Sequence, residues 1–430
     1  MKNCVFTIVA KNYIGVAQIL EQSLKINNPD TDFFIFVADE FDSSFEGQLR
    51  ENIIISREKL DIAASIWTDM SFKYDLTEFC TAIKPSCYKY LLENTEYEKI
   101  IFLDPDIYIF SSFDPIFDML ETHSIVLTPH LSIIRNTYKG EISESGLMGT
   151  GVFNLGFCGI RRSLASLKML DWWHGKLLDK CFIDQYSTYF TDQKWMDFMP
   201  CFFSENELLV ARHLGMNLAP WNFYERQVVL EGSNYLVKAR EEADTDTVPV
   251  IFVHYSGYNY KELKKGNVVQ NNIKTLNDYT DITLLTDIYS KAIQSNNEVF
   301  DRFIELKYSY GKFENGDDIK SFHRRIYRSL TNKGETIAHP FRTDRGSFHA
   351  QLHQLGMTNT LVNNVDKITK STVEGVDSKL VLFNRLMRFV YRVLGFERYL
   401  LLIRLFRPFS RYESQIHLFN KHYDRENINF

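Results

Sequence analysis

The chain has 430 residues, of which 45% are hydrophobic and 24% charged, and its net charge is −6. This length suits two or three domains, and the composition excludes collagen-like, low-complexity and intrinsically disordered proteins. The acidic balance also argues against a nucleic-acid partner, because proteins that neutralise many phosphates show a basic excess. The charge is uneven, since residues 385–430 carry a net +5 and residues 1–384 a net −11.

The first 130 residues alternate short apolar runs with segments of helical periodicity, which is typical of an α/β fold with a parallel sheet. The runs expected to form strands are Val5–Ala10, Phe33–Ala38, Asn52–Ile55, Lys99–Leu103, Ser124–Thr128, Val152–Ile160 and Ile251–Val253. Helices are expected at Ile14–Lys25, at Asp75–Leu92 with a kink at Pro85, and at Ser163–Asp179. Residues 129–150 are expected to form a loop long enough to act as a lid.

Strand patterns fade beyond about residue 275, and the rest of the chain is expected to be helical. Segments 280–313 and 317–331 have helical periodicity, 332–375 has the composition of a connector, and 378–423 predicts one or two basic amphipathic helices. The sequence therefore predicts a catalytic domain over residues 1–275 and a helical C-terminal region over residues 276–430.

The basic tail is a candidate contact with a membrane. Between residues 385 and 411, arginines alternate with bulky apolar residues at helical spacing. This pattern suits the plane of an anionic lipid surface. The alternative is an amphipathic helix packed on the catalytic domain or on a second subunit.

Cysteines and apolar runs bear on the compartment. The six cysteines contain no CxxC pair, so they indicate neither a disulfide framework nor a zinc motif, and small buried thiols in a reducing cytosol are expected. The apolar run before Lys11 is shorter than the core of a signal peptide. The apolar stretch Tyr399–Ile403 falls far short of the ~20 residues that span a bilayer. We therefore expect a cytoplasmic protein, at most peripheral on the inner face of the membrane.

The clearest chemical pattern is IIFLDPDIYIF, in which a buried strand ends at Asp104-Pro105-Asp106. Open α/β sheets bind ligands at the carboxyl ends of their strands. Two carboxylates at i and i+2 in a turn can converge on one Mg²⁺ or Mn²⁺ ion, which offsets the phosphate charge of a nucleotide and stabilises a leaving diphosphate. The alternative is a plain turn, because Asp and Pro are both turn formers.

Several motifs over residues 4–262 resemble, in the same order, those of nucleotide-sugar-dependent glycosyltransferases of GT-A fold, most nearly glycosyltransferase family 8 and related bacterial polysaccharide enzymes. The motifs are TIVAKNYIG (Thr7–Gly15), CTAIKPSCYKYLL (Cys80–Leu92), FLDPD, VFNLGFCGIRRS (Val152–Ser163), TDQKW (Thr191–Trp195), WNFYER (Trp221–Arg226) and HYSGYNYK (His254–Lys261). The resemblance implies a GT-A-type, Rossmann-like mixed sheet flanked by helices, a metal-dependent transferase activity, and retention of the anomeric configuration.

The resemblance also assigns roles to individual residues of this chain. The nucleoside and diphosphate of the donor would meet Ala10, Asn12, Tyr13, Lys84, Asp104, Gly257 and Lys261. The metal, Mn²⁺ or Mg²⁺, would be held by Asp104, Asp106 and His254. The sugar pocket would be lined by Gly156 and by the catalytic candidates Asn154, Asp192 and Gln193, while WNFYER would place Glu225 or Arg226 at the site.

Each of these residue types has a chemical reason and an ordinary structural alternative. A cation at Lys84 would offset the charge of a diphosphate, and the imidazole of His254 can ligate a metal. Lys84 could instead be solvated on a helix edge, His254 hydrogen-bonded in the core, and Thr191 or Asp192 a helix N-cap. Two positions depart from the family pattern, because Lys261 comes one residue late and Pro105 stands where the family has Ala or Ser.

The sequence thus predicts an enzyme that moves a sugar from a nucleotide diphosphate donor, a UDP-sugar by the resemblance, to a surface polysaccharide or lipid-linked oligosaccharide. A haloacid-dehalogenase-type phosphatase is a second hypothesis, because a strand followed by DxD also describes its first motif, with Asp104 as nucleophile. Against it, Tyr108 stands where that superfamily has Thr or Val. A catalytically silent sugar-binding scaffold is the third.

Overall fold

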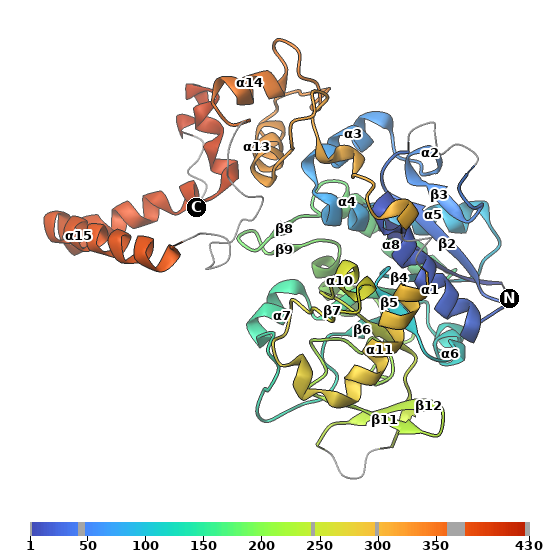
Figure 1. The fold of residues 1–430 in the computed structure, drawn as a ribbon. Coiled ribbons are helices and arrows are strands. Elements are labelled where there is room, and N and C mark those ends of the chain that lie inside the picture. The colour runs from blue at the N-terminus through green and yellow to red at the C-terminus, as the bar shows by residue number, and fades with distance from the viewer. Residues whose placement is uncertain (1, 42–47, 242–245, 297–300, 359–374, 426–430) are drawn as a thin grey trace. The chain divides into compact units, whose positions relative to one another are not determined.

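The structure, a computed structural model, describes residues 2–41, 48–241, 246–296, 301–358 and 375–425 (Figure 1). The chain forms two compact units, the first made of Met1–Ile62 and Leu76–Ser309 and the second of Ala63–Asp75 and Tyr310–Phe430. The first unit thus extends past residue 275, where the sequence placed the boundary. The reason is the helix α11 (Thr280–Ser295), whose Ile282 and Leu285 are buried in a core shared with Tyr255.

The first unit contains all the strands of the described chain. Its first half comprises β1 (Asn3–Val9), η1 (Lys11–Tyr13), α1 (Ile14–Asn27), β2 (Asp32–Val37), β3 (Ile53–Ile55), α2 (Ser56–Lys59), α4 (Leu76–Ala82), α5 (Lys84–Asn94), β4 (Lys99–Leu103), β5 (Ile107–Ile109), α6 (Asp114–Thr122) and β6 (Ile125–Pro129). Its second half comprises α7 (Glu144–Thr150), β7 (Phe153–Arg161), α8 (Leu164–Leu177), β8 (Ile183–Asp184), β9 (Tyr189–Phe190), η3 (Gln193–Phe198), α9 (Met199–Phe202), β10 (Leu208–Val210), β11 (Arg226–Glu231), β12 (Asn234–Ala239), β13 (Val248–Pro249), β14 (Phe252–His254), α10 (Tyr260–Lys264), η4 (Leu276–Asp278) and α11.

Seven strands form the central sheet in the order β10-β6-β7-β4-β1-β2-β3. Strand β1 runs parallel to β2 and β4, β2 runs parallel to β3, and β6 runs parallel to β10, whereas β7 is antiparallel to both β4 and β6. Every residue of β4 is buried, as in strands that are covered on both faces. The mixed α/β sheet expected from the sequence is therefore confirmed.

Helices cover both faces of this sheet (Figure 1). On one face, α1 and α6 share a core with alternate residues of the strands, including Ile101 and Leu103 of β4. On the other face, the ring of Tyr88 on α5 packs edge-on against Phe6 of β1, with 4.7 Å between ring centroids. The Tyr88 hydroxyl donates a 2.5 Å hydrogen bond to the carbonyl of Cys158 on β7. These contacts fix the strands whose ends carry the site.

Two local predictions need correction. The segment expected to be one kinked helix forms α4 and α5, and Pro85 lies in the first turn of α5, where the missing N–H of proline removes no helical hydrogen bond. The segment 129–150, expected to be a loop, contains α7, and the side chain of Ser143 caps that helix by accepting from the backbone N–H of Gly146.

A small antiparallel sheet was not predicted. It is built from β11, β12 and β13, and β11 and β12 are joined by a tight turn in which Gly232 has a φ of +62°. Polar and apolar residues alternate in these strands only in part, so the sequence pattern was weak. A separate pair, β5 with β14, lies beside the site described below.

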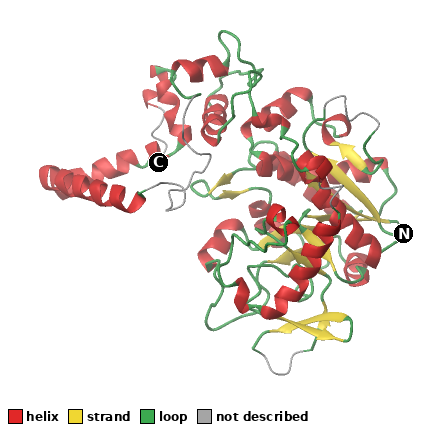
Figure 2. Cartoon of the chain, viewed as in Figure 1, coloured by secondary structure: helices red, strands yellow, loops and turns green. Residues whose placement is uncertain are grey.

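The second unit consists of helices and turns in its described residues (Figure 2). They are α3 (Ala64–Lys73), α13 (Ser321–Asn332), α14 (Phe348–Gln354), α15 (Val376–Phe406), η6 (Pro408–Ser410), η7 (Tyr412–Leu418) and η8 (Lys421–Arg425), with η5 (Ser309–Gly311) at the unit boundary. The expected helical C-terminal region is therefore confirmed. Helix α14 falls inside the predicted connector, of which residues 359–374 lie outside the described chain, as do residues 297–300 of the segment predicted to be helical over 280–313.

The guanidinium of Arg324 explains why residues 63–75 belong to this unit. It donates to the carbonyls of Ser71, Phe72 and Tyr74, at 3.1, 2.6 and 2.7 Å, and so satisfies the carboxyl end of α3. The ring of Phe72 lies in the apolar core of the unit, which also contains Ile416 near the end of the described chain.

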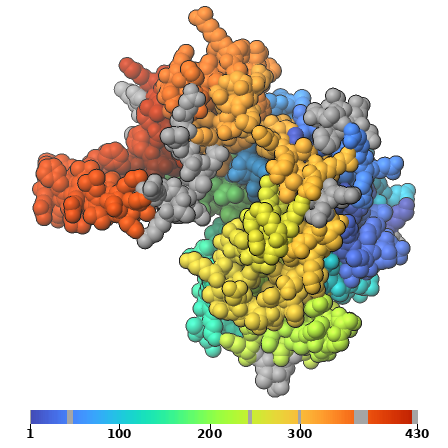
Figure 3. Space-filling model, viewed as in Figure 1, coloured from blue at the N-terminus to red at the C-terminus, as the bar shows by residue number. Residues whose placement is uncertain are grey.

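Helix α15 is interrupted at Gly395, whose φ of +72° is outside the helical region. The rings of Tyr391 and Tyr399, on the two sides of the break, meet edge to face at 5.6 Å. Large apolar side chains are exposed along the helix, among them Leu382 at 68% and Phe389 at 64%. In the space-filling view the atoms of this segment, coloured orange to red, form part of the visible surface (Figure 3). Among the described residues, no helix is both long and apolar enough to cross a membrane.

Candidate functional site

Three potential metal ligands converge at the carboxyl end of β4. Asp104 and Asp106 follow the strand, and β14 pairs antiparallel with β5 so that His254 lies opposite Ile107. The Nε2 atom of His254 lies 3.1 Å from Oδ1 of Asp106 and 3.6 Å from Oδ2 of Asp104. One ligand atom from each residue lies within 4.8 Å of the others. Residues 150 positions apart in the sequence are thus brought to one point by two adjacent strands.

The pKa values of Asp104 and His254 are shifted by burial and by the charges of their neighbours. Burial raises the pKa of Asp104 to about 6, against the lowering effect of Lys84 and His254. Burial alone would lower the pKa of His254, but the charges of Asp106 and Asp104 outweigh it and raise that pKa. The two carboxylate side chains are 32% exposed, so a ligand from solvent can reach them.

This donor set fits a divalent cation. Carboxylate oxygens are the ligands that Mg²⁺ takes in proteins, and Mn²⁺ also accepts imidazole nitrogen. The three donor groups face one another and are partly buried, and the two carboxylates lie close together, so a cation between them would offset their mutual repulsion. The plain-turn alternative for Asp104-Pro105-Asp106 does not account for the imidazole aimed at both carboxylates.

Lys84 and Asp192 form a buried ion pair next to this cluster. The ammonium of Lys84 lies 2.5 Å from Oδ2 of Asp192, and the two side chains are 1% and 2% exposed. The ammonium also donates to the carbonyl of Leu155 at 2.9 Å and lies 3.9 Å from the centre of the Phe102 ring. Burial excludes the solvated alternative for Lys84, and Asp192 makes no side-chain cap bond to η3, which excludes Asp192 as a side-chain cap.

Asn154 and Gln193, predicted to lie together at the sugar pocket, are in contact. The Oε1 atom of Gln193 accepts from the backbone N–H of Leu155 at 3.1 Å and from Nδ2 of Asn154 at 3.4 Å. The Nε2 atom of Gln193 donates to the carbonyl of Thr150 at 2.9 Å. Gln193 therefore ties the end of α7 to the start of β7.

The close approach of His254 leaves room only for glycine at position 156. A Cβ atom on Gly156 would lie 2.4 Å from Cε1 and 2.7 Å from Nδ1 of the His254 ring. Atoms in ordinary van der Waals contact are 3.4–4 Å apart. The absence of a side chain on β7 is what lets the imidazole approach the carboxylates.

Asn217 is a residue of this site that the sequence analysis missed. It is fully buried and has a φ of +55°, in the left-handed region that asparagine tolerates better than most residues. Its side chain contacts His254, Asn154 and Thr128. An asparagine in an unremarkable NLAP segment carries no sequence signal, because only the fold brings it to the potential metal ligands.

The predicted nucleoside loop lies at the neighbouring strand end. Ala10 follows β1, and Asn12 and Tyr13 belong to η1. The ring of Tyr13 packs edge-on against Tyr260 with 4.7 Å between centroids, and burial, Tyr260 and the charge of Asp106 together raise the pKa of the Tyr13 phenol. The buried Oδ1 atom of Asn12 has no hydrogen-bond partner among the described residues.

Two further residues of the HYSGYNYK segment are held by structural contacts. Gly257 has a φ of +81°, and a Cβ there would lie 2.4 Å from Nδ2 of Asn272. The side chain of Lys261 is 47% exposed, and its ammonium lies 3.6 Å from the carboxylate of Glu305. Both residues stay predictions as contacts of the donor.

Glu225 and Arg226 form a buried pair that fastens two loops of the site. The guanidinium of Arg226 donates to the carbonyls of Leu214 and Met216, at 2.9 and 2.7 Å. The Glu225 carboxylate accepts from the backbone N–H and the hydroxyl of Ser132, at 3.2 and 3.1 Å. They hold the backbone next to Asn217 in place.

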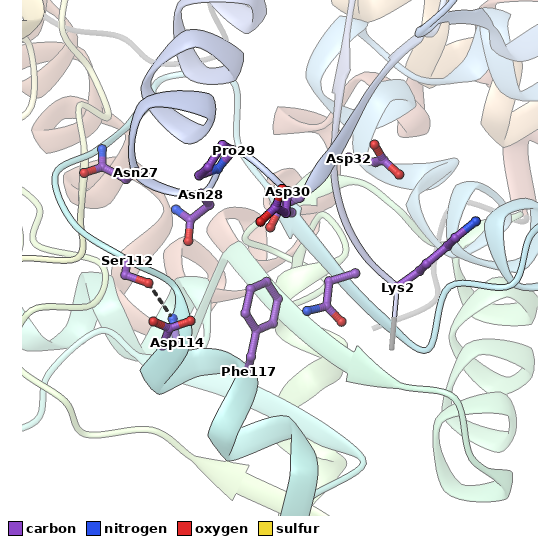
Figure 4. A pocket seen from close by; sticks show the side chains of 11 residues that line it. Lys2, Asn27, Asn28, Pro29, Asp30, Asp32, Ser112, Asp114 and Phe117 are labelled. Carbon is purple, nitrogen blue, oxygen red and sulfur yellow. Dashed lines mark hydrogen bonds between the residues drawn. The ribbon is translucent and has the colours of Figure 1, made fainter.

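A cavity of about 490 Å³ lies at the opposite edge of the sheet, where β1 and β2 begin (Figure 4). It is lined by Lys2, Asn28, Asp30 and Ser112 among others, and the hydroxyl of Ser112 accepts from the backbone N–H of Asp114 at 3.1 Å. No predicted site residue lines it.

A second cavity, of about 420 Å³, borders the predicted sugar pocket. Its lining includes Ile133, Val152, Phe153 and Arg212. Phe153 directly precedes Asn154 on β7, so this hollow lies beside the residues expected to contact a sugar.

Comparison with known proteins gives a curated relative and several solved structures, and no family model matches. The relative is the uncharacterized protein YfnF of Bacillus subtilis, 23% identical over 327 residues, which cover 74% of this chain and all of YfnF. Among solved structures, the galactosyltransferase LgtC in complex with donor and acceptor sugar analogues is 16% identical, with a TM-score of 0.37, over 71% of this chain and 97% of LgtC.

The apo form of the glycosyltransferase GlyE from Streptococcus pneumoniae TIGR4 is 14% identical, with a TM-score of 0.37, over 90% of this chain and 99% of GlyE. The bifunctional glycosyltransferase WbbM is 11% identical, with a TM-score of 0.37, over 71% of this chain and 52% of WbbM.

Proposed function

We propose that this protein is a metal-dependent glycosyltransferase that moves a sugar from a nucleotide diphosphate sugar, most simply a UDP-sugar, to a glycan or glycolipid acceptor. The observation that carries the proposal is the convergence of Asp104, Asp106 and His254, within 4.8 Å, at the carboxyl end of a buried strand. The motifs that resemble glycosyltransferase family 8 support the same function and add that the anomeric configuration is retained.

The three ligands would hold Mn²⁺ or Mg²⁺, which when bound offsets the charge of the donor diphosphate and stabilises the nucleoside diphosphate as it leaves. The neighbouring strand end would bind the nucleoside. Asn12 supports this because its buried Oδ1 is free to accept a hydrogen bond, and Tyr13 because its phenol lies within the field of Asp106.

Lys84 would act on the diphosphate through its charge. Its ammonium lowers the pKa of Asp104 from within a buried pair with Asp192, so its field reaches the metal ligands. In a site of low dielectric constant a fixed positive charge stabilises negative charge that develops during the reaction. Asn154 and Gln193, linked by a 3.4 Å contact, would orient the sugar with amide groups.

The acceptor would be a surface polysaccharide or a lipid-linked oligosaccharide at the cytoplasmic face of the membrane. Helix α15 supports a peripheral contact, because exposed apolar side chains such as Leu382 and Phe389 are interleaved with Arg385, Arg388 and Arg392. Such a surface suits anionic lipid, where arginines meet headgroups and apolar side chains enter the interface.

The test is a screen of UDP-, GDP- and TDP-sugars in which release of the nucleoside diphosphate is followed with Mn²⁺ and with EDTA. We expect release with at least one donor, only when metal is present, and loss of that release in Asp106→Asn. The matched control is Asp114→Asn, which changes an acidic residue at the start of α6, outside the cluster.

Turnover that persists in EDTA, or in Asp106→Asn, would contradict the proposal. Hydrolysis of p-nitrophenyl phosphate with Mg²⁺ would support the phosphatase hypothesis instead. Failure to bind any nucleotide sugar with Mn²⁺ in calorimetry would support the silent scaffold.

A further inference from the structure

Asn217 connects the metal ligands to the predicted sugar pocket. Its Oδ1 atom lies 3.3 Å from Nδ1 of His254, and its Nδ2 atom donates to Oδ1 of Asn154 at 3.0 Å and to the hydroxyl of Thr128 at 2.9 Å. The side chain is fully buried, so no water competes for these bonds. Every polar atom of the Asn217 amide is therefore engaged by protein.

The direction of these hydrogen bonds follows from a backbone group. The N–H of Gly156 can only donate, and it donates to Oδ1 of Asn154 at 3.1 Å. That oxygen must then accept from the NH₂ group of Asn217 as well, which places Oδ1 of Asn217 on the side of His254. An amide oxygen can only accept, so Nδ1 of His254 must carry the proton in this contact.

We propose that Asn217 is a positioning residue for His254, which accepts a hydrogen bond from Nδ1–H and so leaves Nε2, the nitrogen that faces Asp104 and Asp106, as the one that would bind a metal. This inference rests on the proposed metal site, and it adds a group that sets the tautomer and the ring orientation of one ligand. Groups that accept a hydrogen bond from the second nitrogen of a ligating histidine raise its basicity and fix its orientation.

The same amide couples two parts of the site. A shift of Asn154 would be felt by His254 through the single side chain of Asn217, because both of its polar atoms are bonded. The left-handed backbone at residue 217 aims the short side chain at both neighbours. Asparagine is suited to this position because it combines an acceptor with a donor and tolerates a positive φ.

The test measures Mn²⁺ affinity by the EPR signal of free Mn²⁺ in the full-length protein. Asn217→Gly removes the amide and permits the positive φ, and we expect it to weaken Mn²⁺ binding about 10–100-fold, the usual effect of losing such a partner. Asn217→Asp keeps an acceptor for Nδ1–H but loses the donor to Asn154 and Thr128, and we expect it to bind Mn²⁺ more tightly than Asn217→Gly and less tightly than the wild type. If the role of Asn217 were purely structural, Asn217→Asp would bind Mn²⁺ more weakly than Asn217→Gly, because aspartate introduces a buried charge.

A second readout uses the protein labelled with ¹⁵N-histidine and loaded with Mg²⁺. We expect an Nδ1–H correlation of His254, assigned with His254→Asn, that is present in the wild type and absent in Asn217→Gly. The control Glu241→Gly also replaces a residue of positive φ, at +69°, and should leave the signal and the Mn²⁺ affinity unchanged.

The possible results separate this inference from the proposed function. Mn²⁺ affinity within twofold of the wild type in a folded Asn217→Gly, or an Asn217→Asp as weak as Asn217→Gly, would overturn the role of Asn217 and leave the metal site intact. A wild-type protein that binds no Mn²⁺ would overturn both.

Discussion

A methyl group added at residue 156 should disrupt the proposed metal site while leaving the fold in place. In Gly156→Ala the new Cβ would lie 2.4 Å from Cε1 of His254 and 2.8 Å from Oδ1 of Asn154. To restore an ordinary contact, the imidazole must move back by about 1 Å. Metal sites tolerate deviations of only about 0.2 Å in ligand distances. The backbone accepts alanine, because Gly156 lies in the strand β7 and not at a positive φ.

The expected losses follow from that displacement. Overpacking of this kind costs about 1–3 kcal/mol of stability, which a well-packed domain survives. A misplacement of 1 Å can cost about 100-fold in rate. We therefore expect Gly156→Ala to unfold cooperatively at a modestly lower temperature, and to lose about 100-fold in metal-dependent release of the nucleoside diphosphate.

The assay combines that release, Mn²⁺ binding by calorimetry, and thermal unfolding. The matched control is Gly159→Ala on the same strand, whose Cβ would lie 3.3 Å from a flexible methyl of Leu120 and touch no site residue. We expect it to keep Mn²⁺ binding and activity. Retention of wild-type Mn²⁺ affinity by Gly156→Ala would show that the position of His254 does not depend on the empty space at Gly156.

Three other outcomes are expected. Lys84→Met should lose about 3–5 kcal/mol of unfolding free energy in urea, because it leaves Asp192 buried without its cation, and Lys84→Met with Asp192→Leu should recover most of it; a double variant no better than the single one would contradict this. Burial lowers the pKa of both His130 and His323 to about 4. Below pH 6.5 the unfolded chain therefore takes up protons that the native protein does not, and the unfolding free energy should fall between pH 6.5 and 4 by about 3 kcal/mol for each histidine; urea titrations that show no decline there would exclude it. In a co-sedimentation assay, helix α15 should make the protein bind anionic vesicles but not neutral ones, and this binding should weaken at high salt. Equal binding to neutral vesicles would contradict an electrostatic contact.

The sequence predicted the parts of the fold that depend on continuous patterns. The strand Lys99–Leu103 is found at the predicted residues, because the continuous apolar run Ile100–Leu103 is typical of a strand that is covered on both faces. The helix at Ser163–Asp179 was also predictable, since Ser163 caps α8 through its side chain. Pro85 was misread as a kink because a proline in the first turn and a proline in the interior leave the same periodicity.

The residues of the site were predictable where a motif marks them, and not where the fold alone brings them together. Asp104 and Asp106 follow a strand, so their position at a sheet edge could be foreseen. The burial of Lys84 against Asp192 could not, because the two residues are 108 positions apart and each is common on a surface. The proposed role of Asn217 could not be foreseen either, because it depends on contacts that only the fold creates. The backbone N–H of Gly156 orients the amide of Asn154, and Asn154 in turn orients the amide of Asn217.

Anomalous diffraction from crystals soaked with Mn²⁺ and UDP can show whether Asp104, Asp106 and His254 bind one divalent ion, as we propose. We expect a single strong anomalous peak within about 2.0–2.3 Å of a carboxylate oxygen of each aspartate and of Nε2 of His254. The diphosphate should lie on the open side of that peak. Bound UDP with no anomalous peak at these three residues, or with manganese ordered elsewhere, would contradict the account.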